Sequence, residues 1–188
     1  MNRLPVRLSI LTLTTTLAAL VLTVPAQAAP YCGITWGSVA KSHDAYDAEM
    51  INDVRAGRHA CFDRLVIDIG GEDTTFGSYD VRYVGQVYSE AKGDPVPVRG
   101  AADLQIVVRA PAHDSEYRPT YTPANRREIV DVSGYPTFRQ VAWGGSFEAQ
   151  TTIALGVRAR LPFRVFTMAG TAASDHTPRL VIDVAHRW

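Results

Sequence analysis

Hydrophobic and polar residues alternate with a period of two in a series of short segments that begins near residue 61. In CFDRLVIDIGG (61–71), Leu65, Ile67 and Ile69 alternate with other residues, and two glycines end the run. Such alternation predicts a strand with one buried face. The same pattern continues in six later segments, 79–89, 102–110, 137–143, 147–161, 163–168 and 179–186. Many short strands with turns between them are typical of an all-β fold, so we expect a β-sandwich of two sheets.

The connections between these segments are rich in glycine, proline and polar residues. The longest covers 110–127 and contains three prolines but no apolar run, which predicts a long surface loop. Residues 29–52 show no clean periodicity and predict a short irregular N-terminal arm, with a short helix as one option within 38–48.

One strand pattern occurs twice, as RLVIDIG at 64–70 and as RLVIDVA at 179–185. In both copies the alternation directs the leucine and the isoleucine of LVID toward the core. The arginine and aspartate of each copy should point outward or pair across neighbouring strands. Two strands with one pattern fit equivalent places in two halves of a sandwich. The alternative is that LVID consists of residues common in β-strands and occurs in the two strands independently.

The first 28 residues have the pattern of a cleaved signal peptide, with two arginines, an uncharged stretch and a small-x-small ending at 26–28. An uncleaved membrane anchor is the alternative, but the apolar run is shorter than the ~20 residues of a comfortable span. We expect a secreted protein with no membrane span after cleavage. It would consist of the arm, 29–52, and one domain, 53–188.

The chain has only two cysteines, Cys32 and Cys61. An even number of cysteines in an exported chain predicts a disulfide, which here would tether the arm to the strand that begins at Cys61. The alternative is a reactive thiol or a metal ligand, although the sequence has no CxxC motif and no cluster of histidines.

Net charge does not single out a class of ligand. Without Arg3 and Arg7, the 19 lysines and arginines become 17, against 19 aspartates and glutamates, a net charge of −2. This balance gives no overall attraction to nucleic acid or to an anionic membrane, so we expect no nucleic-acid partner. Any charged site must come from the placement of particular residues.

Several segments together resemble a known family. GRHACFDRLVIDIGG, YDVRYV, GAADLQIVVRAP, GSFEAQTTIALGVRARLPFRV and the terminal RLVIDVAHRW are similar to the AMIN-like domain of secreted actinobacterial proteins. That group is related to the AMIN domain of cell-wall amidases and secretins, and the resemblance covers about 53–188. It implies a two-sheet sandwich with approximate internal symmetry and a non-catalytic role. The resemblance implies binding to peptidoglycan or targeting to envelope sites. We expect the partner to be a cell-wall polymer, either peptidoglycan or an attached anionic glycan, and the alternative partner is an envelope protein.

Three arginines in LGVRARLPFRVF form the first candidate binding group. Arg158, Arg160 and Arg164 share one parity and would line one face of a continuous strand. The planar guanidinium fork suits the carboxylates and phosphates of wall polymers. The alternative is a solvated strand face whose arginines pair with carboxylates, namely those of Asp68, Asp183 or Glu148.

A second basic group lies beside the expected disulfide and comprises Arg55 and Arg58, together with His59 and Arg64. We expect Arg55 and Arg58 to contact the same kind of ligand. The alternative is an ordinary turn between two strands.

Aromatic residues in and near the long loop form a third group. Tyr117 and Tyr121 lie within the loop, and Tyr135 and Trp143 follow it. Exposed rings provide platforms for the faces of sugars, which makes Tyr121 a candidate binding residue. The alternative is that the rings pack the loop onto the core.

The sequence contains no recognisable catalytic motif. GGSFE around Ser146 lacks the spacing of a nucleophile elbow, the histidines form no HExxH, and HDSE at 113–116 is typical of a hydrophilic loop. We therefore expect no catalytic residue, no metal and no cofactor. Two alternative functions remain, a regulator that engages a secreted hydrolase through a sheet edge, and a hydrolase whose site is assembled from distant strands.

Overall fold

The computed structural model describes residues 30–45, 49–71, 75–171 and 177–188, and the expected signal peptide lies outside these residues. The described residues form nine strands and no helix. The strands are β1 (Lys41–His43), β2 (Met50–Arg58), β3 (Phe62–Gly70), β4 (Tyr79–Val84), β5 (Ala102–Val108), β6 (Phe138–Phe147), β7 (Gln150–Val157), β8 (Phe163–Met168) and β9 (Arg179–Ala185). Accordingly, no described segment is a helix long and apolar enough to cross a membrane.

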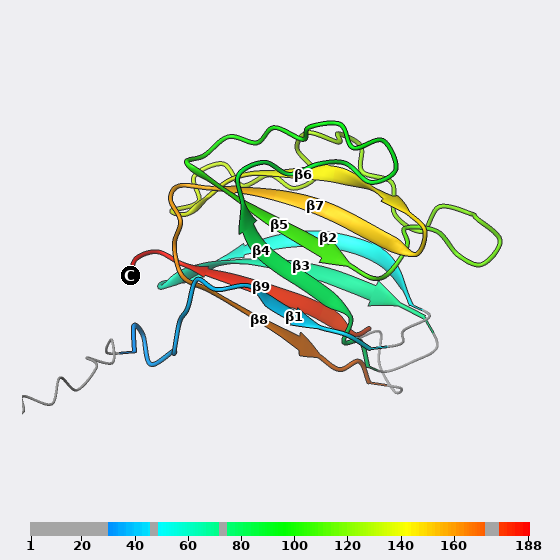
Figure 1. Cartoon of the computed structure of the whole chain (residues 1–188). Helices are drawn as coiled ribbons and strands as arrows, with labels where there is room; N and C mark the ends of the chain where they lie inside the picture. Colours follow the sequence, from blue (N-terminus) through cyan, green and yellow to red (C-terminus); the bar gives the residue numbers. More distant parts are fainter. Residues whose placement is uncertain (1–29, 46–48, 72–74, 172–176) are drawn as a thin grey trace, which may run out of the picture.

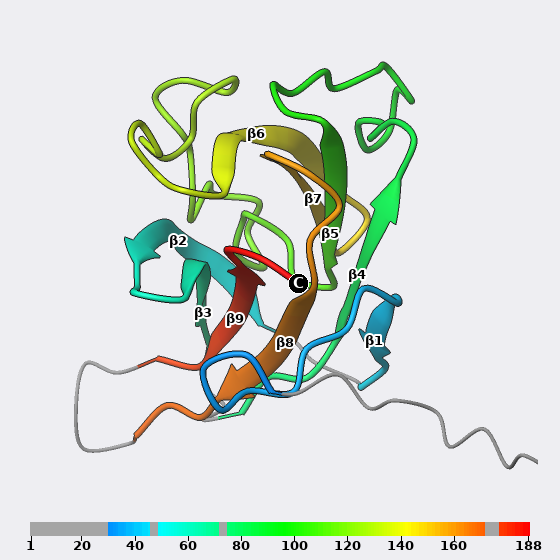
Figure 2. The ribbon, with the colours of Figure 1, turned by 90° about the vertical axis from the view of Figure 1, so that its left-hand side faces the viewer.

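The strands form two antiparallel sheets that face each other (Figure 1). One sheet has the order β1-β4-β5-β7-β6, and the other has the order β2-β3-β9-β8. Figure 2 shows the two layers from the side, with long connections above the five-stranded sheet. The expected all-β sandwich is confirmed.

The core lies between the inner faces of the sheets. Leu65, Ile67 and Ile69 of β3 are fully buried, and so are the matching Leu180, Ile182 and Val184 of β9. The period-two pattern therefore predicted the inward side of both strands correctly. Since apolar burial is the main favourable term in folding, this shared layer is what holds the two sheets together.

The two copies of the repeated pattern do not occupy equivalent places in two halves of the sandwich, so that expectation is wrong. They form β3 and β9, which are neighbours in one sheet. Their antiparallel register pairs Arg64 with Asp183, and Asp68 with Arg179. Val66 lies opposite Val181 at the centre. A segment that begins with arginine and ends with aspartate complements a second copy of itself when the two run in opposite directions. The approximate symmetry is a local twofold between two strands.

The N-terminal arm is tethered to the domain as expected, since Cys32 and Cys61 form a disulfide. The helix considered within 38–48 is wrong for the described part, because 41–43 form β1 and pair with β4. The boundary expected at 52/53 falls inside β2. A register shift between Ile51 and Asp53 interrupts the alternation there, which explains why the start of this strand looked irregular in the sequence.

Two long connections cover one end of the five-stranded sheet. The connection from β5 to β6 contains the expected loop 110–127 and extends to Thr137. The connection from β4 to β5 packs valines onto the outer face of the sheet, in a small second cluster built on Val87, Ala142 and Ala154. Between them, these connections shape the hollow described below as the loop pocket.

Candidate functional site: an arginine face and a loop pocket

The outer face of the four-stranded sheet collects arginines, and we call it the arginine face. It consists of Arg55 on β2, Arg64 on β3, Arg179 on β9 and Arg164 on β8, with the carboxylates of Asp68 and Asp183 and the rings of Trp36, Phe62 and Phe166. The strand register places these side chains in rows across the sheet. Because side chains alternate along a strand, the leucines of the two LVID segments point into the core, and the arginines and aspartates beside them point to the outer face.

Asp183 is the centre of this face. Its side chain is fully buried, yet it accepts hydrogen bonds from two arginines. Arg64 donates from Nε to Oδ1 at 2.6 Å and from Nη2 to Oδ2 at 2.9 Å, and Arg164 donates from Nε to Oδ2 at 2.7 Å. One carboxylate shared by two guanidinium groups leaves a local charge of +1, which favours an anionic ligand.

Aromatic rings pack against the guanidinium groups of Arg64 and Arg164. The Cζ atom of Arg164 lies 5.0 Å from the ring centroid of Phe166, 5.4 Å from that of Phe62 and 5.6 Å from that of Trp36. The Cζ atom of Arg64 lies 5.2 Å from the centroid of Phe62. These distances are typical of cation–π contacts, which fix the orientation of the donors while their edges remain usable.

Trp36 belongs to the N-terminal arm and is positioned by several contacts. Its Nε1 donates to the carbonyl of Tyr31 at 2.9 Å, and the next residue, Gly37, bridges to Phe163 at the start of β8. The disulfide fixes the arm from the other side. The arm therefore does more than tether the chain, because it contributes a ring to this face.

Arg55 lies on the edge strand β2 and extends the arginine face to that edge of the sheet. It donates from Nε and Nη2 to Asp68 at 2.6 and 2.9 Å, with exposed fractions of 49% for the arginine side chain and 16% for the aspartate. The hydrogen bond to Asp68 raises the pKa of the Arg55 guanidinium. Arg58, at the end of β2, donates to the carbonyl of Gly134 at 3.1 Å and is exposed.

The three arginines of LGVRARLPFRVF do not line one strand. β7 ends at Val157, a bend covers 158–160, and β8 begins at Phe163 on the other sheet. Arg158 donates to the carbonyls of Pro136 and His186, while Arg160 lies over the ring of Tyr83. Only Arg164 lies on the arginine face. The expectation of one continuous face is wrong because the strand changes sheets at Pro162, where no N–H is available for a ladder.

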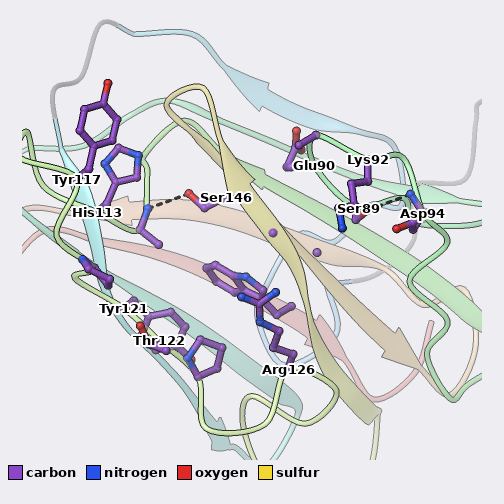
Figure 3. A pocket seen from close by; sticks show the side chains of 17 residues that line it. Ser89, Glu90, Lys92, Asp94, His113, Tyr117, Tyr121, Thr122, Arg126 and Ser146 are labelled. Carbon is purple, nitrogen blue, oxygen red and sulfur yellow. Dashed lines mark hydrogen bonds between the residues drawn. The ribbon is translucent and has the colours of Figure 1, made fainter.

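The aromatic group around Tyr121 contributes to a separate hollow, which we call the loop pocket. It has a volume of about 580 Å³ and lies between the two long connections and β6. Figure 3 shows Ser89, Glu90, Lys92 and Asp94 on one side, with His113, Tyr117, Tyr121 and Thr122 on the other. Trp143 of β6 also lines this pocket.

The rings of the aromatic group differ in their packing. Tyr121 and Trp143 contact each other with ring centroids 5.4 Å apart, and both are partly buried against the core. Burial raises the pKa of Tyr121 to about 12. Tyr135 stacks on Phe138 at 6.0 Å and does not line the pocket, so for this ring the packing alternative holds.

The HDSE loop is organised by hydrogen bonds within itself. Asp114 accepts hydrogen bonds from the backbone N–H groups of Glu116 and Arg118, both at 2.9 Å, and from the Arg118 side chain at 2.7 Å. These bonds, led by the one from the Arg118 backbone, lower the pKa of Asp114. Within the ranges that the structure describes, no three histidine, cysteine or acidic side chains are grouped as metal ligands would be.

Sequence reasoning missed three parts of these sites. Phe62 and Phe166 share the parity of Arg64 and Arg164, so the alternation itself contained the signal for them. Trp36 gave no such signal, because an irregular arm has no periodicity to show which surface a ring will cover. The turn 89–94 forms one wall of the loop pocket and lies in the connection that follows the expected strand 79–89, where no pattern marked it as part of a site.

No curated protein and no solved structure matches the chain. The family model of the AMIN-like domain matches residues 49–186. This range begins at the residue before β2 and ends just after β9, so it contains both sheets except the short β1. Such a domain indicates a cell-wall-related binding module. The chain therefore belongs to the AMIN-like domain family.

Proposed function

We propose that the protein is an exported, non-catalytic module that binds a cell-wall polymer on its arginine face. The ligand is peptidoglycan or an anionic glycan attached to it, because stem-peptide carboxylates and polymer phosphates are the groups that guanidinium forks recognise best. The observation that carries the proposal is the sharing of the buried Asp183 by Arg64 and Arg164, beside three aromatic rings.

The shape of this face suits a long ligand. A sheet surface presents its rows of side chains at regular spacing, about 4.8 Å from strand to strand. Arg55, Arg64 and Arg164 come from three of the four strands, so their guanidinium groups are spread across the sheet. A polymer with repeated negative groups can contact several of them in turn, and weak contacts then add up through multivalency.

Retention of the purified protein on bacterial cell walls tests the proposal. Walls are used intact and after acid removal of the accessory polymers, at low and at high salt. Retention that disappears with the polymers identifies the anionic glycan, whereas retention by stripped walls identifies peptidoglycan. Salt should weaken binding in the first case, because it screens exposed charges. Failure to bind either preparation would overturn the proposal and favour a protein partner.

A matched pair of variants locates the binding surface. Arg55→Ala with Arg164→Ala removes two positive charges from the arginine face. Exposed charge contacts are worth about 0.2–1 kcal/mol each, so we expect roughly two- to thirty-fold weaker retention. Arg99→Ala with Arg118→Ala removes the same charge elsewhere, from arginines that pair with Glu128 and Asp114. Equal losses in both double variants would show that only net charge matters. Release of soluble wall fragments would contradict a non-catalytic role.

A further inference from the structure

Both walls of the loop pocket are short turns tied back to the protein. On one side, a bridge joins Tyr88 to Pro95, and the Glu90 N–H donates to the carbonyl of Gly144 at 2.8 Å. On the other side, a bridge joins His113 to Pro119, and the Ala112 N–H donates to Oγ of Ser146 at 2.9 Å, as Figure 3 shows. The walls are thus fixed in the absence of a ligand, which lowers the entropy cost of binding.

The floor of the pocket is a bulge in β6. The register with β7 shifts between Trp143 and Gly145, and Gly145 has a φ of 107°, a conformation that favours glycine. A Cβ at Gly144 would lie 2.6 Å from Cγ2 of Thr152, and one at Gly145 would lie 3.5 Å from Cβ of Glu90, so these glycines let β7 and the Glu90 turn approach the bulge closely. The glycines thus bring the Glu90 wall against the floor, and the pocket opens beside this contact.

Tyr117 is held in an unusual way at the rim. Its φ is 61°, in the left-handed region that bulky residues avoid, and 81% of its surface is exposed. Its ring stacks on His113 with centroids 5.1 Å apart and makes no contribution to the core. An exposed aromatic ring in a strained backbone conformation gains little for folding, and such strain is concentrated at binding sites.

The polar groups of the pocket are fixed and balanced in charge. Glu90 accepts hydrogen bonds from Nε2 of Gln150 at 2.8 Å and from Oγ1 of Thr152, so its carboxylate is held beside the floor. Glu90 and Asp94 are offset by Lys92 and Arg126 in the lining. This pocket therefore has no formal net charge to attract a polyanion, in contrast to the arginine face.

We propose that the loop pocket binds an uncharged pyranose oligosaccharide. A pyranose ring has an apolar face of C–H groups and an edge of hydroxyl groups. The rings of Tyr117, Tyr121 and Trp143 suit the apolar face, while Glu90 and its neighbours accept from and donate to the hydroxyl edge. A proline-rich peptide also docks on aromatic grooves, but its prolines have no N–H to donate to the carboxylates of Glu90 and Asp94. This site does not depend on the function proposed for the arginine face.

The three tryptophans of the chain provide the test. Each indole N–H gives its own signal in a ¹H–¹⁵N correlation spectrum of the purified protein. Trp143 reports on the loop pocket, Trp36 on the arginine face and the exposed Trp188 on neither. The probes are the β-1,4-linked tetrasaccharides of glucose and of N-acetylglucosamine. We expect at least one of them to shift the Trp143 signal alone, in a titration unaffected by salt.

Two tyrosine variants test whether the sugar binds in the loop pocket. Tyr117→Ala should weaken the affinity about five- to tenfold, the loss of one stacking contact, while the thermal melt stays unchanged because the ring is outside the core. Tyr88→Ala is the control, since Tyr88 is 55% exposed on the neighbouring turn but does not line the pocket. The proposal is overturned if neither sugar shifts Trp143, or if Tyr117→Ala binds as well as the parent. A shift of Trp36 with an anionic polymer would support the arginine face whatever these sugars do.

Discussion

Asp183→Asn tests how the repeated RLVID pattern is used, because the first copy of the pattern offers a matched control. In the first copy, Asp68 occupies the same position as Asp183, and each aspartate pairs with arginine on a neighbouring strand. The two differ in surroundings. Asp183 is fully buried between two arginines, whereas Asp68 is 16% exposed and pairs with one arginine that is half-exposed.

The expected magnitudes follow from that difference. Removing one partner of a buried ion pair costs about 3–5 kcal/mol, since the remaining charge stays desolvated. Arg64 and Arg164 retain exposed fractions of 23% and 32%, so water can reach them and the lower end, about 3 kcal/mol, applies. The pair of Arg55 and Asp68 is largely at the surface, and its loss should cost about 0–1 kcal/mol.

Thermal and urea unfolding of the two variants measure the difference. At about 2–4 °C per kcal/mol for a chain of this size, Asp183→Asn should lower Tm by roughly 6–12 °C and Asp68→Asn by at most ~4 °C. The urea slope should stay constant, because the area exposed on unfolding is unchanged. If the two substitutions cost the same, or if Asp183→Asn costs under ~1 kcal/mol, burial is not what distinguishes the two copies.

Three further predictions concern stability. Reduction of the disulfide between Cys32 and Cys61, which are 29 residues apart, should lower the free energy of unfolding by about 3–4 kcal/mol, measured in urea with and without reductant. Burial raises the pKa values of Tyr83 and Tyr121 to about 12, so the unfolded chain loses these protons first, near its ordinary value of about 10. The contribution of these two tyrosines to stability should be constant below pH 10 and fall between pH 10 and 12, and Tyr83→Phe should lose less stability across that window. Gly156→Ala places a Cβ 2.0 Å from the carbonyl oxygen of Arg99 and should cost about 1–3 kcal/mol, whereas Gly85→Ala, with nothing within 4 Å, should change Tm little.

The sequence contained most of the fold and little of the site. Period-two alternation located the strands from β3 onward, because burial on one face of a sheet imposes that period. It failed at β2, where the bulge near Ile51 changes the parity, and around Pro162, where one apolar segment serves two sheets. Alternation describes which side a residue faces, but it contains no information about which strands become neighbours.

The sites depend on that missing information. Arg64 and Arg164 lie far apart in the chain and meet only because β9 lies between β3 and β8. Tyr121 and Trp143 could be selected as aromatic candidates from the sequence. The opposite wall at Glu90 could not be predicted, because its position depends on the path of an irregular connection. Placement of a binding residue on a loop is determined by tertiary hydrogen bonds, and these leave no periodic signal.

The self-complementary pairing of β3 and β9 also bears on association between molecules. A strand that pairs with a copy of itself inside one chain can do the same with a copy in another chain, which is a route to aggregation. In the folded protein neither copy lies at an edge, because β2 covers β3 and β8 covers β9. The edge strands β2 and β8 therefore shield two aggregation-prone strands from other molecules. Variants that loosen β2 or β8 should aggregate more readily than equally destabilised variants of the five-stranded sheet.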